Sequence, residues 1–145
     1  MSKGEKAKEY FMNGYNCAQS TAMAFADDIN MAPETVAKLT IGFGGGMGRM
    51  REVCGSISGI TFVLSALYGD QPKSDVYKMV QDVAAEFKKV NGSIVCRELL
   101  GLSKSDPITP VAEKRTTEYY RKRPCAELVE IAANALENYL KGTDK

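Results

Sequence analysis

Residues 125–140 read CAELVEIAANALENYL, with apolar side chains returning every three or four positions. One face of a helix would carry Leu128, Ala132, Ala135 and Tyr139. This spacing is typical of an amphipathic helix packed against a core. Pro124 stands at a favourable first helical position, and Gly142 follows the stretch as a stop signal. We therefore expect a long helix here.

The remaining segments carry the same helical start and stop signals. Val76, Val80, Val83 and Phe87 form a second apolar stripe at helical spacing. No segment shows the alternation of a half-buried strand. Besides 125–140, helices are expected at 4–14, 17–28, from 33, 54–68, 75–92 and 111–123, with a short helical segment at 93–101. The sequence therefore predicts an all-α fold, a single-domain bundle of six or seven helices spanning residues 1–145.

Composition excludes several function classes. The 145 residues hold 19 Lys and Arg against 18 Asp and Glu, a net charge of +1. The chain therefore lacks the excess of positive charge that attracts the phosphate backbone of a nucleic acid. The absence of His excludes Ser-His-Asp and Cys-His catalysis within one chain. The N-terminus does not resemble a signal peptide, and the apolar run 60–67 is too short for a membrane span. We expect a cytoplasmic protein.

Four cysteines carry the distinctive chemistry, and each lies at or near an expected helix start: Cys17, Cys54, Cys96 and Cys125. The positive end of a helix dipole stabilises a thiolate, as do the basic residues that flank three of the four. Buried cysteine also serves as a small apolar side chain, so a purely structural role is an alternative.

The spacing of the four cysteines along the chain excludes two common kinds of cysteine site. Gaps of 37, 42 and 29 residues exclude a C-x-x-C dithiol and the paired knuckles of structural zinc. Four dispersed thiolates can still meet around an iron–sulfur cluster. Four cysteines allow three disulfide connectivities, and the sequence does not choose among them.

The stretch IGFGGGMGRMREVCGSISG, residues 41–59, precedes the second expected core helix. It lacks the context of a dinucleotide or P-loop motif. We expect its glycines to fold the backbone over Cys54 with amide donors around the sulfur, so that Cys54 is the primary thiolate with a pKa below about 7.5. The expected support comes from loop residues Gly44, Gly45, Gly46, Gly48, Arg49 and Arg51. Gly55 and Gly59 are expected to let a neighbouring helix come close.

The four cysteine contexts together resemble the C-GCAxxG-C-C family of redox-active proteins. The family motif corresponds to the glycine-rich run followed by CGSISG, with Ser56 where the motif usually has Ala. The other three cysteines stand in NCAQ, SIVCRELLG and RPCAELV, and the resemblance covers residues 15–140. It implies thiol–disulfide or electron-transfer chemistry and names no substrate.

The leading hypothesis is therefore a redox-active protein whose four cysteines converge at one end of the bundle. Cys54 would react first, and Cys17, Cys96 or Cys125 would resolve it. The alternatives are a four-thiolate iron–sulfur protein, with the same four cysteines as metal ligands, and a small binding module with structural cysteines. The expected partners are a redox partner or a small-molecule substrate; a homodimer is left open, as are enzymatic activity and the cofactor.

Overall fold

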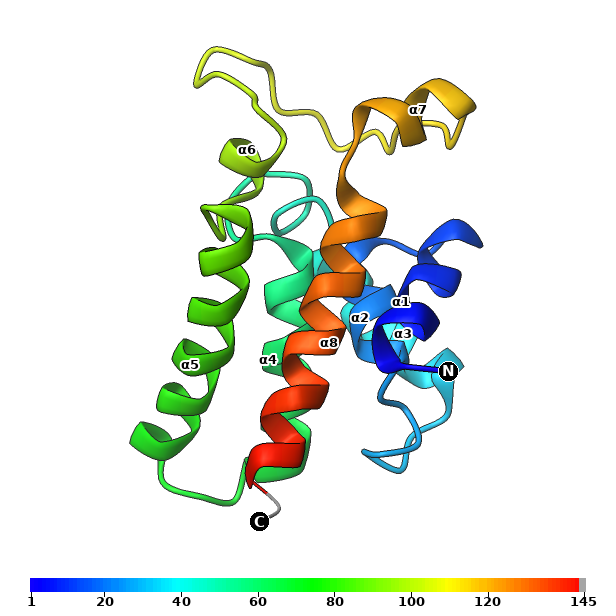
Figure 1. Ribbon diagram of the computed structural model, residues 1–145. Helices are drawn as coiled ribbons and strands as arrows, with labels where there is room; N and C mark the ends of the chain where they lie inside the picture. The colour runs from blue at the N-terminus through cyan, green and yellow to red at the C-terminus, as the bar shows by residue number, and fades with distance from the viewer. Residues whose placement is uncertain (144–145) are drawn as a thin grey trace.

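The computed structural model describes residues 1–143; at positions 121, 122 and 143 it describes the backbone alone. Eight α-helices and one 3-10 helix take up more than half of this part of the chain, as expected (Figure 1). In order they are α1 (Lys3–Met12), α2 (Cys17–Met23), α3 (Pro33–Thr40), η1 (Ile41–Phe43), α4 (Gly55–Tyr68), α5 (Lys73–Asn91), α6 (Cys96–Leu99), α7 (Thr117–Lys122) and α8 (Cys125–Thr143).

Helix α8 is the central element of the bundle. It packs against α1, α2, α4 and α5, while α2 packs against α4 (Figure 1). Its apolar face buries Val129, Ala132 and Leu136 completely, as its helical periodicity predicts. The largest fully buried side chains around it are Phe11, Phe25 and Phe87. The long C-terminal helix and the all-α bundle are therefore confirmed.

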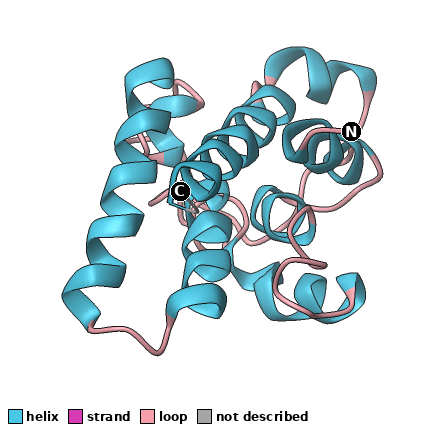
Figure 2. Cartoon of the chain, turned by 60° about the horizontal axis from the view of Figure 1, so that its bottom comes forward, coloured by secondary structure: helices cyan, strands magenta, loops and turns pink. Residues whose placement is uncertain are grey.

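Helices and loops make up nearly all of the described chain (Figure 2). Within residues 1–143 the strand-like pairing is a single antiparallel bridge between Val53 and Val95. No helix in that range is both long enough and apolar enough to cross a bilayer.

Two expected helices are shorter than the sequence signals suggested. The segment 17–28 is α-helical to Met23 and continues as turns, and Asn30 adopts a positive φ of 55°. The segment 111–123 becomes helical at residue 117, where the Thr116 side chain accepts a hydrogen bond from the Tyr119 amide. Residues 111–115 run as a loop instead: Arg49 donates to the Val111 carbonyl, and the Arg115 side chain donates to the carbonyls of Phe11 and Tyr15.

Candidate functional site

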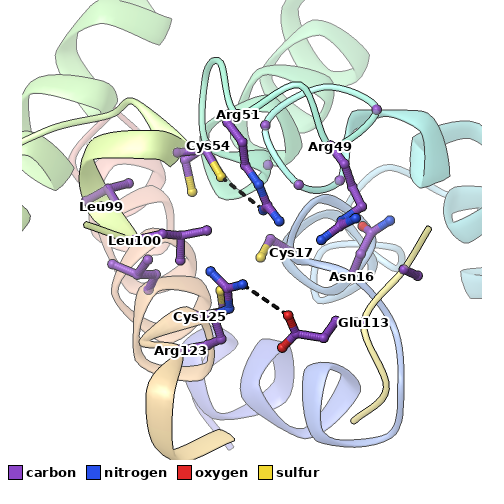
Figure 3. A pocket seen from close by; sticks show the side chains of 18 of the residues that line it. Asn16, Cys17, Arg49, Arg51, Cys54, Leu99, Leu100, Glu113, Arg123 and Cys125 are labelled. Carbon is purple, nitrogen blue, oxygen red and sulfur yellow. Dashed lines mark hydrogen bonds and ion pairs between the residues drawn. The ribbon is translucent and has the colours of Figure 1, made fainter. Parts of the chain in front are cut away.

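All four cysteines line one cavity of about 410 Å³ at a single end of the bundle (Figure 3). Each stands at a helix N-terminus, as the sequence predicts. Cys17, Cys96 and Cys125 are the first residues of α2, α6 and α8, and Cys54 is the N-cap residue of α4. The bundle therefore directs four helix starts from distant parts of the chain toward the same space.

Cys17 and Cys125 are close neighbours across the contact between α2 and α8. The interaction between the two thiols lowers the pKa of Cys125 and raises that of Cys17 well above its ordinary value. The positive charges of Arg123, Arg115 and Arg51 lower the pKa of Cys125 further, against the opposing effect of burial. Cys125 is therefore the cysteine on which a negative charge is best stabilised.

Cys54 does not have the lowered pKa that the sequence predicts. Burial raises its pKa to about 11, although the neighbouring Ser56 acts in the opposite direction. Its side chain is only 3% exposed. The prediction that Cys54 has a depressed pKa is therefore wrong, because desolvation of the thiolate outweighs the helix start and its donors.

Cys96 lies diagonally across the Val53–Val95 bridge from Cys54. The Cys54 amide donates to the Ile94 carbonyl, the Cys96 amide donates to the Glu52 carbonyl, and the Val53–Val95 bridge lies between them. Burial raises the pKa of Cys96, opposed by the Arg51 guanidinium 3.7 Å from its sulfur. The four thiols thus divide into a pair joined by side chains and a pair held by the backbone.

The glycine-rich loop folds upon itself rather than around the Cys54 sulfur. The amides of Met47, Gly48, Arg49, Arg51 and Glu52 all donate to carbonyls of residues 42–46. The expectation that loop amides surround the Cys54 sulfur is therefore wrong. Gly44, Gly45, Gly46 and Gly48 do line the cavity, as does Gly55.

Gly46 has the clearest steric reason to be glycine. Its φ is +76°, and an added Cβ would lie 2.6 Å from the Cys96 Cβ and 2.7 Å from the Glu52 nitrogen. No larger residue fits between the loop and Cys96 without displacing one of them.

Helix α4 approaches α2 through its two small residues, as expected. A Cβ at Gly59 would lie 2.9 Å from the Ala18 carbonyl oxygen, and one at Gly55 would lie 3.2 Å from the Cys17 Cβ. These contacts determine how closely Cys17 lies beside the start of α4. Gly59 supports this packing and does not line the cavity itself.

Arg49 and Arg51 lie at the cavity but do not contact Cys54 as expected. Arg49 donates to the carbonyls of Thr109 and Val111, which joins the glycine-rich loop to the segment that precedes α7. Arg51 donates to the Cys96 sulfur. In Figure 3 their guanidinium groups enter the same space from the glycine-rich loop.

Sequence reasoning missed two charged residues of the cavity, Glu113 and Arg115. Arg115 donates to the carbonyls of Phe11 and Tyr15 at the end of α1, at 2.8 and 2.9 Å, and stacks over the Phe11 ring. Glu113 pairs with Arg123 at 3.1 Å. Both lie in a loop whose sequence shows no periodicity, so only the tertiary contacts bring them to the cysteines.

A metal-binding role is tested by the positions of the donor side chains. Across residues 1–143, no group of three or more His, Cys, Asp or Glu side chains is placed to hold one metal ion. The cysteines share a cavity, but their arrangement here does not form a ligand set. The four-thiolate iron–sulfur site that the sequence left open does not fit this arrangement.

Comparisons with known proteins agree with the cysteine pattern. An uncharacterized protein of Archaeoglobus fulgidus is 28% identical over 159 aligned residues, covering 97% of each chain. No solved structure gives a significant match. A family model described as "Putative redox-active protein (C_GCAxxG_C_C)" matches residues 15–139, a range that contains all four cysteines and runs from α2 into α8. The chain therefore belongs to the C-GCAxxG-C-C redox-active family.

Proposed function

We propose that this protein carries out thiol–disulfide exchange with Cys125 as the attacking thiolate and Cys17 as the resolving thiol. The observation that carries the proposal is that Cys17 and Cys125, the first residues of α2 and α8, line the same cavity, where the interaction between the two thiols lowers the pKa of Cys125. A thiolate is the nucleophile in exchange, and its resolving partner must lie within reach of the same sulfur. The Cys17–Cys125 pair meets both requirements.

The exchange runs in two steps that conserve electrons. The Cys125 thiolate attacks a substrate disulfide, forms a mixed disulfide and releases one thiolate. Cys17 then loses its proton and attacks the Cys125 sulfur, which closes the Cys17–Cys125 disulfide and releases the second thiolate. The substrate disulfide is reduced to two thiols, the cysteine pair is oxidised, and a dithiol partner returns the pair to the reduced state.

Cys54 and Cys96 have raised pKa values, and we propose that they form a less reactive pair held in reserve beside the first. Their backbone pairing keeps them adjacent whatever the state of Cys17 and Cys125. A reducing compartment such as the cytoplasm would keep all four thiols reduced between turnovers.

The test is to identify the first disulfide that forms. The reduced protein is mixed with one equivalent of 2-hydroxyethyl disulfide, quenched by alkylation at intervals and mapped by peptide mass spectrometry. We expect the linked Cys17–Cys125 peptide first, both in the wild type and in a Cys54→Ser, Cys96→Ser variant. A Cys54–Cys96 link that forms first would overturn the proposal. So would a brown protein with stoichiometric iron and sulfide after anaerobic purification.

A further inference from the structure

The cavity holds more positive charge than its own acidic residue neutralises. Four arginines line it, against one carboxylate, Glu113. The arginines are Arg49, Arg51, Arg115 and Arg123. The whole chain carries a formal charge of only +1, so the excess at the cavity is a local concentration of charge. Such a concentration in a concave site attracts and holds anions.

Arg51 differs from the other three in its partners. Arg49 and Arg115 donate to backbone carbonyls, and Arg123 pairs with Glu113. Among the contacts of the described residues, the Arg51 guanidinium donates to the Cys96 sulfur and to no oxygen. A guanidinium has five N–H donors in a planar fork that matches a carboxylate. Figure 3 shows this group pointing into the cavity.

The rest of the cavity suits a small organic molecule. Its volume of about 410 Å³ falls in the range of small-ligand sites. Leu99, Leu100 and Leu128 supply an apolar wall, while exposed residues at the rim, such as Gly42 and Ala112, leave the cavity open to solvent. A ligand with a charged end and a short aliphatic body would meet complementary surfaces at both.

We propose that this cavity is a binding site for small anions and, resting on the proposed function, that the oxidant of the Cys17–Cys125 pair is a low-molecular-weight disulfide bearing carboxylates. The Arg51 guanidinium receives a carboxylate, and the disulfide of the bound molecule lies against Cys125. The Cys125 thiolate breaks that S–S bond, and Cys17 then displaces the second half of the molecule. Two electrons pass from the cysteine pair to the disulfide, and the Cys17 proton leaves with the released thiol.

The experiment compares three disulfides of similar length and different charge: dithiodipropionate (dianion), 2-hydroxyethyl disulfide (neutral) and cystamine (dication). Rates of Cys17–Cys125 oxidation are divided by the rates for a short unstructured cysteine peptide, which removes intrinsic reactivity. We expect the dianion to exceed the neutral compound by about tenfold and the dication to be slowest. Raised salt should reduce the ratio.

Arg51→Asn is the decisive variant, because Asn tolerates the positive φ of 63° at this position. It should remove most of the preference for the dianion, while Arg51→Lys should retain part of it. Arg97→Ala is the matched control, since Arg97 donates to the Ser103 carbonyl and does not line the cavity. A preference equal to that of the peptide, or one that survives in Arg51→Asn, would overturn the inference.

An unreactive ligand separates this inference from the proposed function. Suberate has two carboxylates at nearly the separation found in dithiodipropionate but no disulfide, so calorimetry measures binding without exchange. Binding that depends on Arg51 supports the anion site even if no Cys17–Cys125 disulfide forms, in which case the exchange proposal alone fails. No suberate binding together with normal exchange would overturn the anion site alone.

Discussion

Cys125 and Cys54 occupy similar positions at the starts of α8 and α4, yet their pKa values shift in opposite directions. Cys125 gains a thiol donor from Cys17 and the charges of nearby arginines. Cys54 is buried in the core, where desolvation outweighs the opposing effect of Ser56. A helix dipole contributes roughly 0.3–1 kcal/mol, which is less than the desolvation of a buried thiolate costs. The contacts at each helix start therefore decide its acidity.

The largest expected effect is on the stability of the protein at high pH. With a pKa of about 11 in the folded state and about 8.5 in the unfolded chain, Cys54 contributes stability that is complete below pH 8.5. Because the unfolded chain loses this proton first, about 3 kcal/mol should be lost as the pH rises to 11. Urea unfolding in excess reductant should show a steeper loss for the wild type than for Cys54→Ala. Parallel curves for the two proteins would contradict the assigned burial of the thiol.

The next effect concerns which thiol reacts first. At pH 7 Cys125→Ser should slow the fastest alkylation by about tenfold or more, because the thiolate fraction sets the rate. Cys54→Ser, the matched variant at the other helix start, should leave that phase unchanged. Iodoacetamide labelling with site-resolved mass spectrometry measures both. Loss of the fast phase in Cys54→Ser instead would show that Cys54, and not Cys125, reacts first.

A smaller effect tests the interaction between the paired cysteines. Cys17→Ala removes the Cys17 thiol and should raise the pKa of Cys125, since a neighbouring donor stabilises the charged thiolate. Cys17→Ser keeps a hydroxyl donor in the same place and should retain most of the lowering. Thiolate absorbance against pH, in a background of Cys54→Ser and Cys96→Ser, reports the difference. Equal pKa values in the two variants would show that Cys17 does not act as a donor.

The smallest effect concerns a single nearby charge. Arg123→Gln should raise the pKa of Cys125 by less than Cys17→Ala does, because two other arginines remain and solvent screens part of the field. Arg97→Gln is the control, with its side chain directed to Ser103. The same absorbance titration at low and high salt should show the Arg123 effect shrinking as salt increases. If Arg97→Gln shifted the pKa of Cys125 as much, the effect would not be specific to Arg123.

The sequence predicts the helices of this fold well, because their apolar spacing is local. The stripe along α8 and the small residues Gly55 and Gly59 indicate the packing faces that the structure shows. The position of each cysteine at a helix start could likewise be predicted from the sequence. Their convergence on one cavity was expected, but their division into pairs was not, because Cys17 and Cys125 meet only after α2 packs against α8.

Other features of the site depend on contacts that no local pattern encodes. The first residues of the expected helix over 111–123 instead form a loop, where Arg49 and Arg115 make contacts between distant parts of the chain. The acidity predicted for Cys54 assumed an exposed helix start, whereas the core covers it. The run of glycines predicted a tightly folded loop but not which groups its amides contact. In the structure these amides donate to carbonyls of the same loop.

The contact between α2 and α8 joins positions 17 and 125, near opposite ends of the chain. A covalent bond there would close a ring of more than a hundred residues that includes most of the bundle. Restricting so long a segment of the unfolded chain would stabilise the folded state by roughly 4–5 kcal/mol in the chain-entropy model. Oxidation of the proposed pair would then raise the melting temperature of the entire molecule, so that the oxidised protein would resist unfolding more than the reduced protein does.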